Sequence, residues 1–100
     1  MSYNVSKQGE KITVKFEGNL NFTSNEDFRA TLDQIGKIGG NEVYFDLSGL
    51  THIDSVGLGL LYIAKEDLEG LGLRLCLASP QGNVLRLLEL TDARRTFTIV

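Results

Sequence analysis

Several residue types that commonly build catalytic or cross-linked sites are scarce in this chain of 100 residues. It has one cysteine, Cys76, one histidine, His52, one proline and no tryptophan. A single cysteine excludes a disulfide within the chain and a cysteine-rich metal site, and the alternating run around Cys76 predicts a small residue in a strand. The single histidine has no evident metal-binding neighbours. We therefore expect neither a metal nor a cofactor.

The chain also lacks a long apolar run and a cluster of basic residues. No run approaches the ~20 residues of a membrane-spanning helix, and Met1–Asn4 has neither the basic nor the apolar region of a signal peptide. The net charge is −3, and Arg94-Arg95 is the only adjacent basic pair, which argues against nucleic-acid binding. We expect a cytoplasmic protein that neither binds nucleic acid nor inserts into a membrane.

Residue types of a hydrolase are present without the arrangement that a hydrolase needs. His52, Asp54 and Ser55 lie within four positions, and near-neighbours on one loop seldom place the base between nucleophile and acid. No Gly-x-Ser-x-Gly elbow occurs. Gly57-Leu58-Gly59 begins like a dinucleotide fingerprint, but Tyr62 stands where the third glycine is required. The sequence predicts no catalytic residues, and we expect His52 to be an exposed loop residue.

What is present is the patterning of one small α/β domain. The length fits a single domain over residues 1–100, and 42% hydrophobic and 23% charged residues are ordinary for a globular protein. Strand-like alternation and helix-like spacing follow one another in the order β-β-α-β-α-β-α-β. The opening hairpin must be antiparallel and strands joined through helices run parallel, so we predict a mixed β-sheet with helices packed against it.

Local signals predict the boundaries of these elements. The expected strands are a hairpin turning at Gln8-Gly9-Glu10, a central strand Val43–Leu47 ended by Ser48-Gly49, an alternating run Leu71–Leu77 and a closing strand Phe97–Val100. The expected helices run from a capping box of Thr23 and Glu26 to Gly36, from Ser55 to Glu69, and from Ser79-Pro80 through Leu90. The expected core-facing residues of the three helices are Phe28, Leu32 and Ile35, then Leu61, Ala64 and Leu68, then Val84, Leu87, Leu88 and Leu90.

The most informative stretch is Asp54–Gly59, between the central strand and the second helix. The hydroxyl of Ser55 would lie beside the first N–H groups of that helix, which have no intrahelical partner. Those donors and the helix dipole favour an anion, so a phosphate on Ser55 would be stabilised where it forms. The alternative is that Asp54 or Ser55 only caps the helix. Gly57 and Gly59 each cost about 1 kcal/mol of helix propensity, either to let another surface approach or to relieve crowding against strands.

Residues Phe45–Gly59 read Phe-Asp-Leu-Ser-Gly-Leu-Thr-His-Ile-Asp-Ser-Val-Gly-Leu-Gly. This segment resembles the core motif of the STAS domain, as found in bacterial anti-sigma factor antagonists, and the rest of the chain agrees in pattern. The resemblance implies one STAS domain over residues 1–100, with Ser55 as the phosphorylation site. The next position in the family is often a second serine or threonine, but here it is Val56, which removes a competing acceptor.

By this resemblance the protein is a phosphoprotein that works by partner switching in signal transduction and transcription regulation. With Ser55 unmodified it would dock on an anti-sigma factor with serine kinase activity, phosphorylation would release that partner, and a phosphoserine phosphatase would reverse the mark. The implied partner-binding residues are Asp54, Ser55, Val56, Gly57, Leu58 and Asn21. The alternative is a constitutive STAS subunit of a lipid-transporting ABC system, which binds without phosphorylation.

Overall fold

Five strands form one sheet in which the spatial order follows the chain, β1-β2-β3-β4-β5. The computed structural model describes all residues, 1–100. The strands are β1 (Ser2–Gln8), β2 (Lys11–Leu20), β3 (Glu42–Ile53), β4 (Arg74–Ala78) and β5 (Thr98–Ile99), and the helices are α1 (Asn25–Ile38), α2 (Ser55–Gly70) and α3 (Gly82–Leu90). Two short 3-10 helices, η1 (Phe22–Ser24) and η2 (Ala93–Arg95), complete the chain. The predicted order of strands and α-helices is confirmed.

The sheet is mixed, as predicted. β1 and β2 form an antiparallel hairpin with Val5 opposite Val14, and Gly9 turns between them with a φ of 62°. Such a positive φ favours glycine because it lacks a Cβ. β3, β4 and β5 each follow a helical connection and run parallel to the preceding strand.

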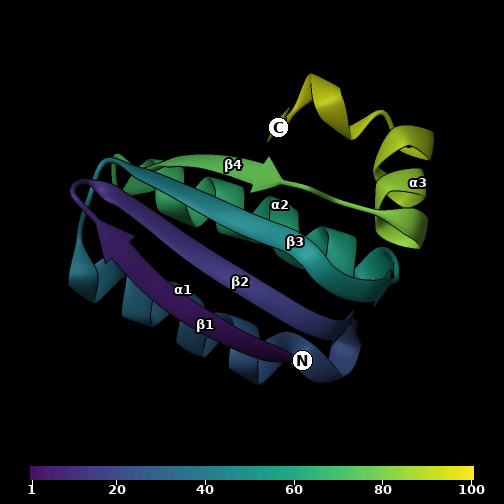
Figure 1. Ribbon diagram of the computed structural model, residues 1–100, viewed down its shortest axis with the longest axis horizontal. Coiled ribbons are helices and arrows are strands. Elements are labelled where there is room, and N and C mark those ends of the chain that lie inside the picture. The colour runs from purple at the N-terminus through teal and green to yellow at the C-terminus, as the bar shows by residue number, and fades with distance from the viewer.

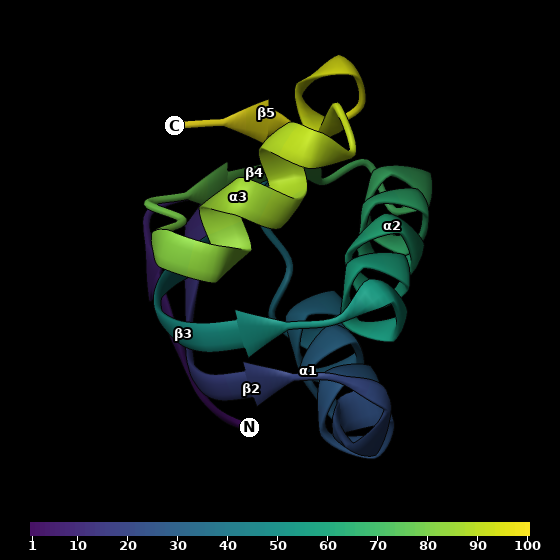
Figure 2. The same cartoon turned by 90° about the vertical axis from the view of Figure 1, so that its right-hand side faces the viewer.

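The helices α1 and α2 lie side by side on one face of the sheet, behind it in Figure 1 and to its right in Figure 2. The strand residues that face them alternate along the sequence and are buried, as are the core-facing residues of both helices. Phe16, Phe28 and Phe45 form the centre of the core, with ring centroids 5.0 to 6.0 Å apart. α3 lies beyond the end of the sheet at which β2 and β3 finish (Figure 1). None of the helices has both the length and the apolar character needed to cross a membrane.

The central strand is longer than predicted, because Ser48-Gly49 forms a bulge instead of ending it. Between the pairs Lys15–Asp46 and Glu17–Gly49, β3 advances one residue more than β2. The Asp46 carboxylate accepts hydrogen bonds from the N–H of Ser48 at 3.0 Å and from its hydroxyl at 2.7 Å. A turn-like pair of residues is thereby absorbed within the strand, which continues to Ile53.

The predicted boundaries of the first helix are wrong at both ends. A capping box of Asn21 and Ser24 begins η1, which leads directly into α1, so Thr23 and Glu26 do not form the predicted box. At the other end the helix passes Gly36 and stops at Ile38, where Gly39 adopts a φ of 73°. The three predicted core residues of this helix are nevertheless buried.

The closing strand β5 is shorter than predicted, Thr98–Ile99 in place of Phe97–Val100, and two further departures lie on either side of β4. Leu71 does not belong to the strand: it is exposed in the turn that closes α2, where Gly72 adopts a φ of 82°. Ser79-Pro80 does not begin α3, because the N–H of Ser79 still bonds to the carbonyl of Val100. The N-cap of α3 is Gln81, and Leu90 at its end is exposed.

Candidate functional site

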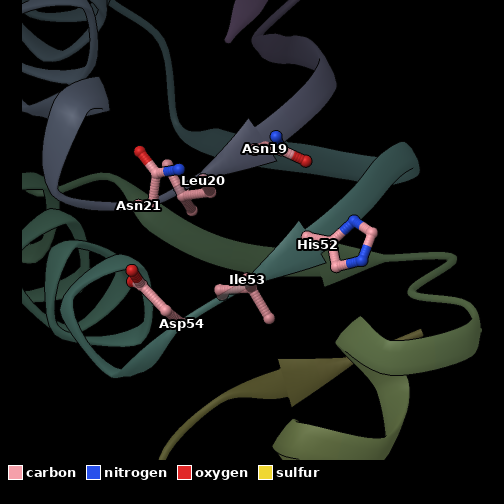
Figure 3. A pocket seen from close by; sticks show the side chains of 6 residues that line it. All are labelled: Asn19, Leu20, Asn21, His52, Ile53 and Asp54. Carbon is pink, nitrogen blue, oxygen red and sulfur yellow. The ribbon is translucent and has the colours of Figure 1, made fainter.

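The carboxyl ends of β2 and β3 meet at one edge of the sheet, because the two strands are parallel. Leu20 pairs with Ile53 there, and the N–H of Asp54 donates to the carbonyl of Leu20 at 3.3 Å. The ends of the two strands and the residues that follow them form a pocket of about 190 Å³. Its lining residues are Asn19, Leu20, Asn21, His52, Ile53 and Asp54. Figure 3 shows Asn21 and Asp54 on the side next to α2, with Asn19 and His52 on the other side.

Asp54 is the N-cap of α2. One of its carboxylate oxygens accepts a hydrogen bond from the N–H of Gly57 at 2.7 Å, and its carbonyl accepts the N–H of Leu58 at 2.9 Å. The side-chain bond satisfies one of the donors that a helix N-terminus leaves unpaired, and the carbonyl accepts the first bond of the helix itself. The capping alternative is therefore confirmed for Asp54. It leaves the next residue, Ser55, free of any capping role.

Ser55 occupies the first position of α2 and is exposed. Its hydroxyl makes no hydrogen bond within the chain, and the N–H groups of Ser55 and Val56 have no acceptor in the protein. No lysine or arginine occurs in residues 19–24 or 51–58, the two segments that meet at this edge of the sheet. A phosphate placed here would meet helix N–H donors, and neither of these segments offers it a basic side chain.

Asn21 lies at the pocket and also holds the chain between β2 and α1. Its side-chain oxygen accepts from the N–H of Thr23 at 3.0 Å and from the Thr23 hydroxyl at 2.6 Å. Its own N–H donates to the hydroxyl of Ser24, a buried side chain that in turn donates to the carbonyl of Asn19. Asn21 is half-exposed at the site and also has a structural role. Sequence reasoning missed Ser24 as the second half of this capping box.

Two predicted site residues face inward. Leu58 is only 9% exposed and belongs to the core, so its side chain is not an exposed contact beside Ser55. Gly57 is buried too, and a Cβ added there would clash with the carbonyl oxygen of Leu20. For Gly57 the crowding explanation is thus correct. It fails for Gly59, where an added Cβ would have no neighbour within 4 Å.

The exposed side chains around Ser55 are therefore a different set from the predicted one. Asp54 and Val56 remain, and Val56 is 48% exposed. Sequence reasoning missed Phe22, which is 69% exposed on η1, the short helix that packs against α2. No sequence signal separates this phenylalanine from a core residue, since its exposure follows from the direction of the 3-10 turn.

His52 is exposed, as predicted, but it is the penultimate residue of β3 and not part of a loop. Its ring lies across the pocket from Asp54 (Figure 3). No group of three or more His, Cys, Asp or Glu side chains is placed to hold a metal ion. The pocket is also smaller than the roughly 300–1,000 Å³ typical of small-molecule sites.

Comparison with known proteins identifies the family. The family model described as STAS domain matches residues 2–100. The chain belongs to the STAS domain family. A STAS-domain containing protein of Pseudomonas aeruginosa is 26% identical over 94 residues, which cover 94% of this chain and 92% of that protein. The predicted membership of the STAS domain family is confirmed.

Solved structures of similar fold include anti-sigma factor antagonists. A candidate anti-sigma factor antagonist from Thermotoga maritima matches this STAS domain with a TM-score of 0.86 at 23% identity, covering 97% of this chain and 84% of that one. The anti-sigma factor antagonist SpoIIAA matches at 17% identity in its unphosphorylated form, with a TM-score of 0.73 over 99% of this chain and 87% of that one. The phosphorylated form, from Bacillus, matches with a TM-score of 0.72 over 99% and 91%. The predicted α/β STAS fold is confirmed.

Proposed function

We propose that this STAS domain is an anti-sigma factor antagonist whose binding is gated by phosphorylation of Ser55. In the unmodified state the surface around Ser55 docks on an anti-sigma factor with serine kinase activity. That partner transfers a phosphoryl group from its own ATP to the Ser55 hydroxyl, and the modified domain dissociates. A phosphoserine phosphatase restores the binding form. The domain itself acts by binding, in the cytoplasm, and catalyses no reaction.

The observation that carries this proposal is the free hydroxyl of Ser55 at the start of α2. It is exposed and unbonded, while the neighbouring Asp54 satisfies the helix cap. A phosphoserine carries about −1.5 to −2 charges at pH 7. The adjacent N–H groups of Ser55 and Val56, which have no acceptor in the chain, can donate hydrogen bonds to the phosphate without disturbing the fold. Ser55 is therefore suited to carry a modification that the fold tolerates.

The same phosphate would weaken docking because it adds bulk and charge to the middle of the contact surface. No lysine or arginine of the surrounding segments neutralises it, so a partner that covers it must desolvate an unpaired charge. The proposed contact residues are Asn21, Asp54, Ser55 and Val56. Gly57 and Leu58 enter the proposal only as the buried support of the first turn.

The proposal is tested by phosphorylation of the purified protein. Every anti-sigma factor of the serine-kinase type encoded in the source genome is purified, and each is incubated with ATP, Mg²⁺ and the wild type. Intact mass and peptide mapping should then find one phosphoryl group on Ser55 with at least one kinase. Ser55→Ala should remain unmodified, since no second acceptor follows Ser55 in the motif. Ser6→Ala removes a different exposed serine, on β1, and should be phosphorylated like the wild type.

Modification chiefly at Thr51, or modification that persists in Ser55→Ala, would contradict the assignment of the site. A wild type that no kinase modifies, but that copurifies with components of a transporter, would favour the constitutive STAS subunit. The two functions are thereby separated without knowledge of the output pathway.

A further inference from the structure

The outward face of α2 carries a row of residues that the fold does not use. Val56, Gly59, Ile63 and Asp67 are spaced at i, i+3, i+7 and i+11, which places them along one side of the helix. Val56 is 48% and Ile63 is 38% exposed, and Asp67 is exposed. The opposite side of the helix is buried in the core. We call these four residues the α2 strip.

Gly59 is the feature of the strip that needs an explanation. A glycine inside a helix lowers its stability. Gly57, two residues earlier, is required by the carbonyl oxygen of Leu20, but a Cβ at Gly59 would meet nothing within 4 Å. The packing of the domain therefore does not account for Gly59. A glycine between two exposed apolar residues does leave room for another helix to approach the α2 backbone closely.

The charge of the strip changes along its length. Its first half is apolar, while beyond Ile63 the exposed residues Glu66 and Asp67 are acidic and make no ion pair. Lys65, the one basic residue of α2, is held by Glu69 at 2.7 Å. A complementary surface is therefore apolar at the end near Ser55 and basic at the other end.

We propose that the α2 strip is the binding site for an amphipathic helix of the partner. This helix crosses α2 at Gly59, contacts Val56 and Ile63 with apolar side chains, and places lysine or arginine against Glu66 and Asp67. The inference rests on the proposed function and deepens it, since it names the part of the partner that docks. A phosphate on Ser55 would then fall beside the apolar end of the strip, where an unpaired charge is most costly to desolvate.

The test exploits the opposite effects that filling Gly59 should have on stability and on binding. Gly59→Gln and Gly36→Gln each replace a helix-interior glycine of ordinary backbone conformation, the second on α1, where an added Cβ would meet only Leu71, just past the far end of α2. Both variants should raise the melting temperature by roughly 2–8 °C. Each is titrated calorimetrically against every serine-kinase anti-sigma factor of the source genome. Gly59→Gln should bind the cognate kinase at least roughly tenfold more weakly than wild type, and Gly36→Gln should bind unchanged.

The acidic end of the strip has its own pair of variants. Asp67→Asn should weaken binding a few-fold and reduce its salt dependence, whereas Asp33→Asn, an exposed acid on α1, should change neither. Wild-type affinity in Gly59→Gln would refute binding of the partner at the α2 strip. Wild-type affinity in Asp67→Asn would refute a basic group of the partner at its acidic end.

If Ser55→Asp loses affinity while Gly59→Gln keeps it, binding at the strip is refuted and the proposed function stands. If the reverse holds, the gating by Ser55 fails and the strip stands. Absence of any binding by the wild type would contradict both.

Discussion

Single side chains hold the irregular parts of the chain around the site. Asp46 does so at the β3 bulge, where one carboxylate oxygen accepts two hydrogen bonds from Ser48. Partial burial raises the pKa of Asp46, but the Ser48 hydroxyl, its N–H and the charge of Lys15 together hold this pKa below its ordinary value. The ionised form of Asp46 is thus favoured in the folded protein. The bulge lies in the strand that leads to Asp54.

This carboxylate makes stability depend on pH. Because the pKa of Asp46 is lower in the folded state, its contribution is present above the unfolded value of about 3.9 and is lost as pH falls through the folded value. Asp46→Asn should lower the free energy of unfolding by about 0.5–1 kcal/mol at pH 7, a modest loss because the group is partly exposed. Urea unfolding of both proteins at about pH 7 and about pH 2.5 measures this. The gap should close at the lower pH, and a gap of equal size at both would contradict the role assigned to Asp46.

At the residue scale, sequence reasoning succeeded where the determining contact is local. Asp54 and Ser55 are placed by a strand end followed by a helix start, a pattern visible within a few positions. The direction of Leu58 depends instead on how α2 rests on the sheet, which no local pattern contains. The same holds for Gly57, whose neighbour Leu20 lies far away in the sequence.

At the scale of elements, the boundaries of α2 and the end of α3 could be predicted, whereas the boundaries of α1 and the start of α3 could not. α2 has a side-chain cap on its first turn, and its predicted start at Ser55 is correct. A 3-10 turn with its own capping box precedes α1, so α1 begins after Thr23. For α3, pairing of the segment after β4 with the chain end delays the helix, and that pairing is non-local. The period of hydrophobic residues still identified every strand and α-helix.

The start of α2 should tolerate a negative charge. Ser55→Asp adds one at the first helical position, beside unpaired N–H groups, which is worth about 0.3–1 kcal/mol. Repulsion from Asp54 cancels part of this, so thermal stability should be unchanged or slightly raised. Asp54→Ala, which removes the cap on Gly57, should instead cost about 0.5–2 kcal/mol. Thermal and urea unfolding of the two variants compare these effects, and a fall of many degrees for Ser55→Asp would show that the helix start cannot carry a phosphate.

At the scale of the whole molecule, the site lies at the sheet edge where β2 and β3 both end, at the start of a helix packed on the core (Figures 1 and 3). The first turn of α2 is closely packed on its inner side, where Leu58 is buried and Gly57 approaches the carbonyl of Leu20. A phosphate on Ser55 would lie on the outer side of this turn, away from that packing. We therefore expect the modification to act on the partner's surface, with the fold of the domain unchanged.

The most direct test of the account compares the modified and unmodified protein in one titration. The domain is phosphorylated to completion on Ser55 by its cognate kinase, purified, and titrated calorimetrically against that kinase beside the wild type and Ser55→Ala. We predict that Ser55→Ala binds like the unmodified wild type, and that the phosphorylated protein binds at least roughly tenfold more weakly, a loss on the order of 1.4 kcal/mol. Equal affinity of the phosphorylated and unmodified proteins would contradict gating by Ser55.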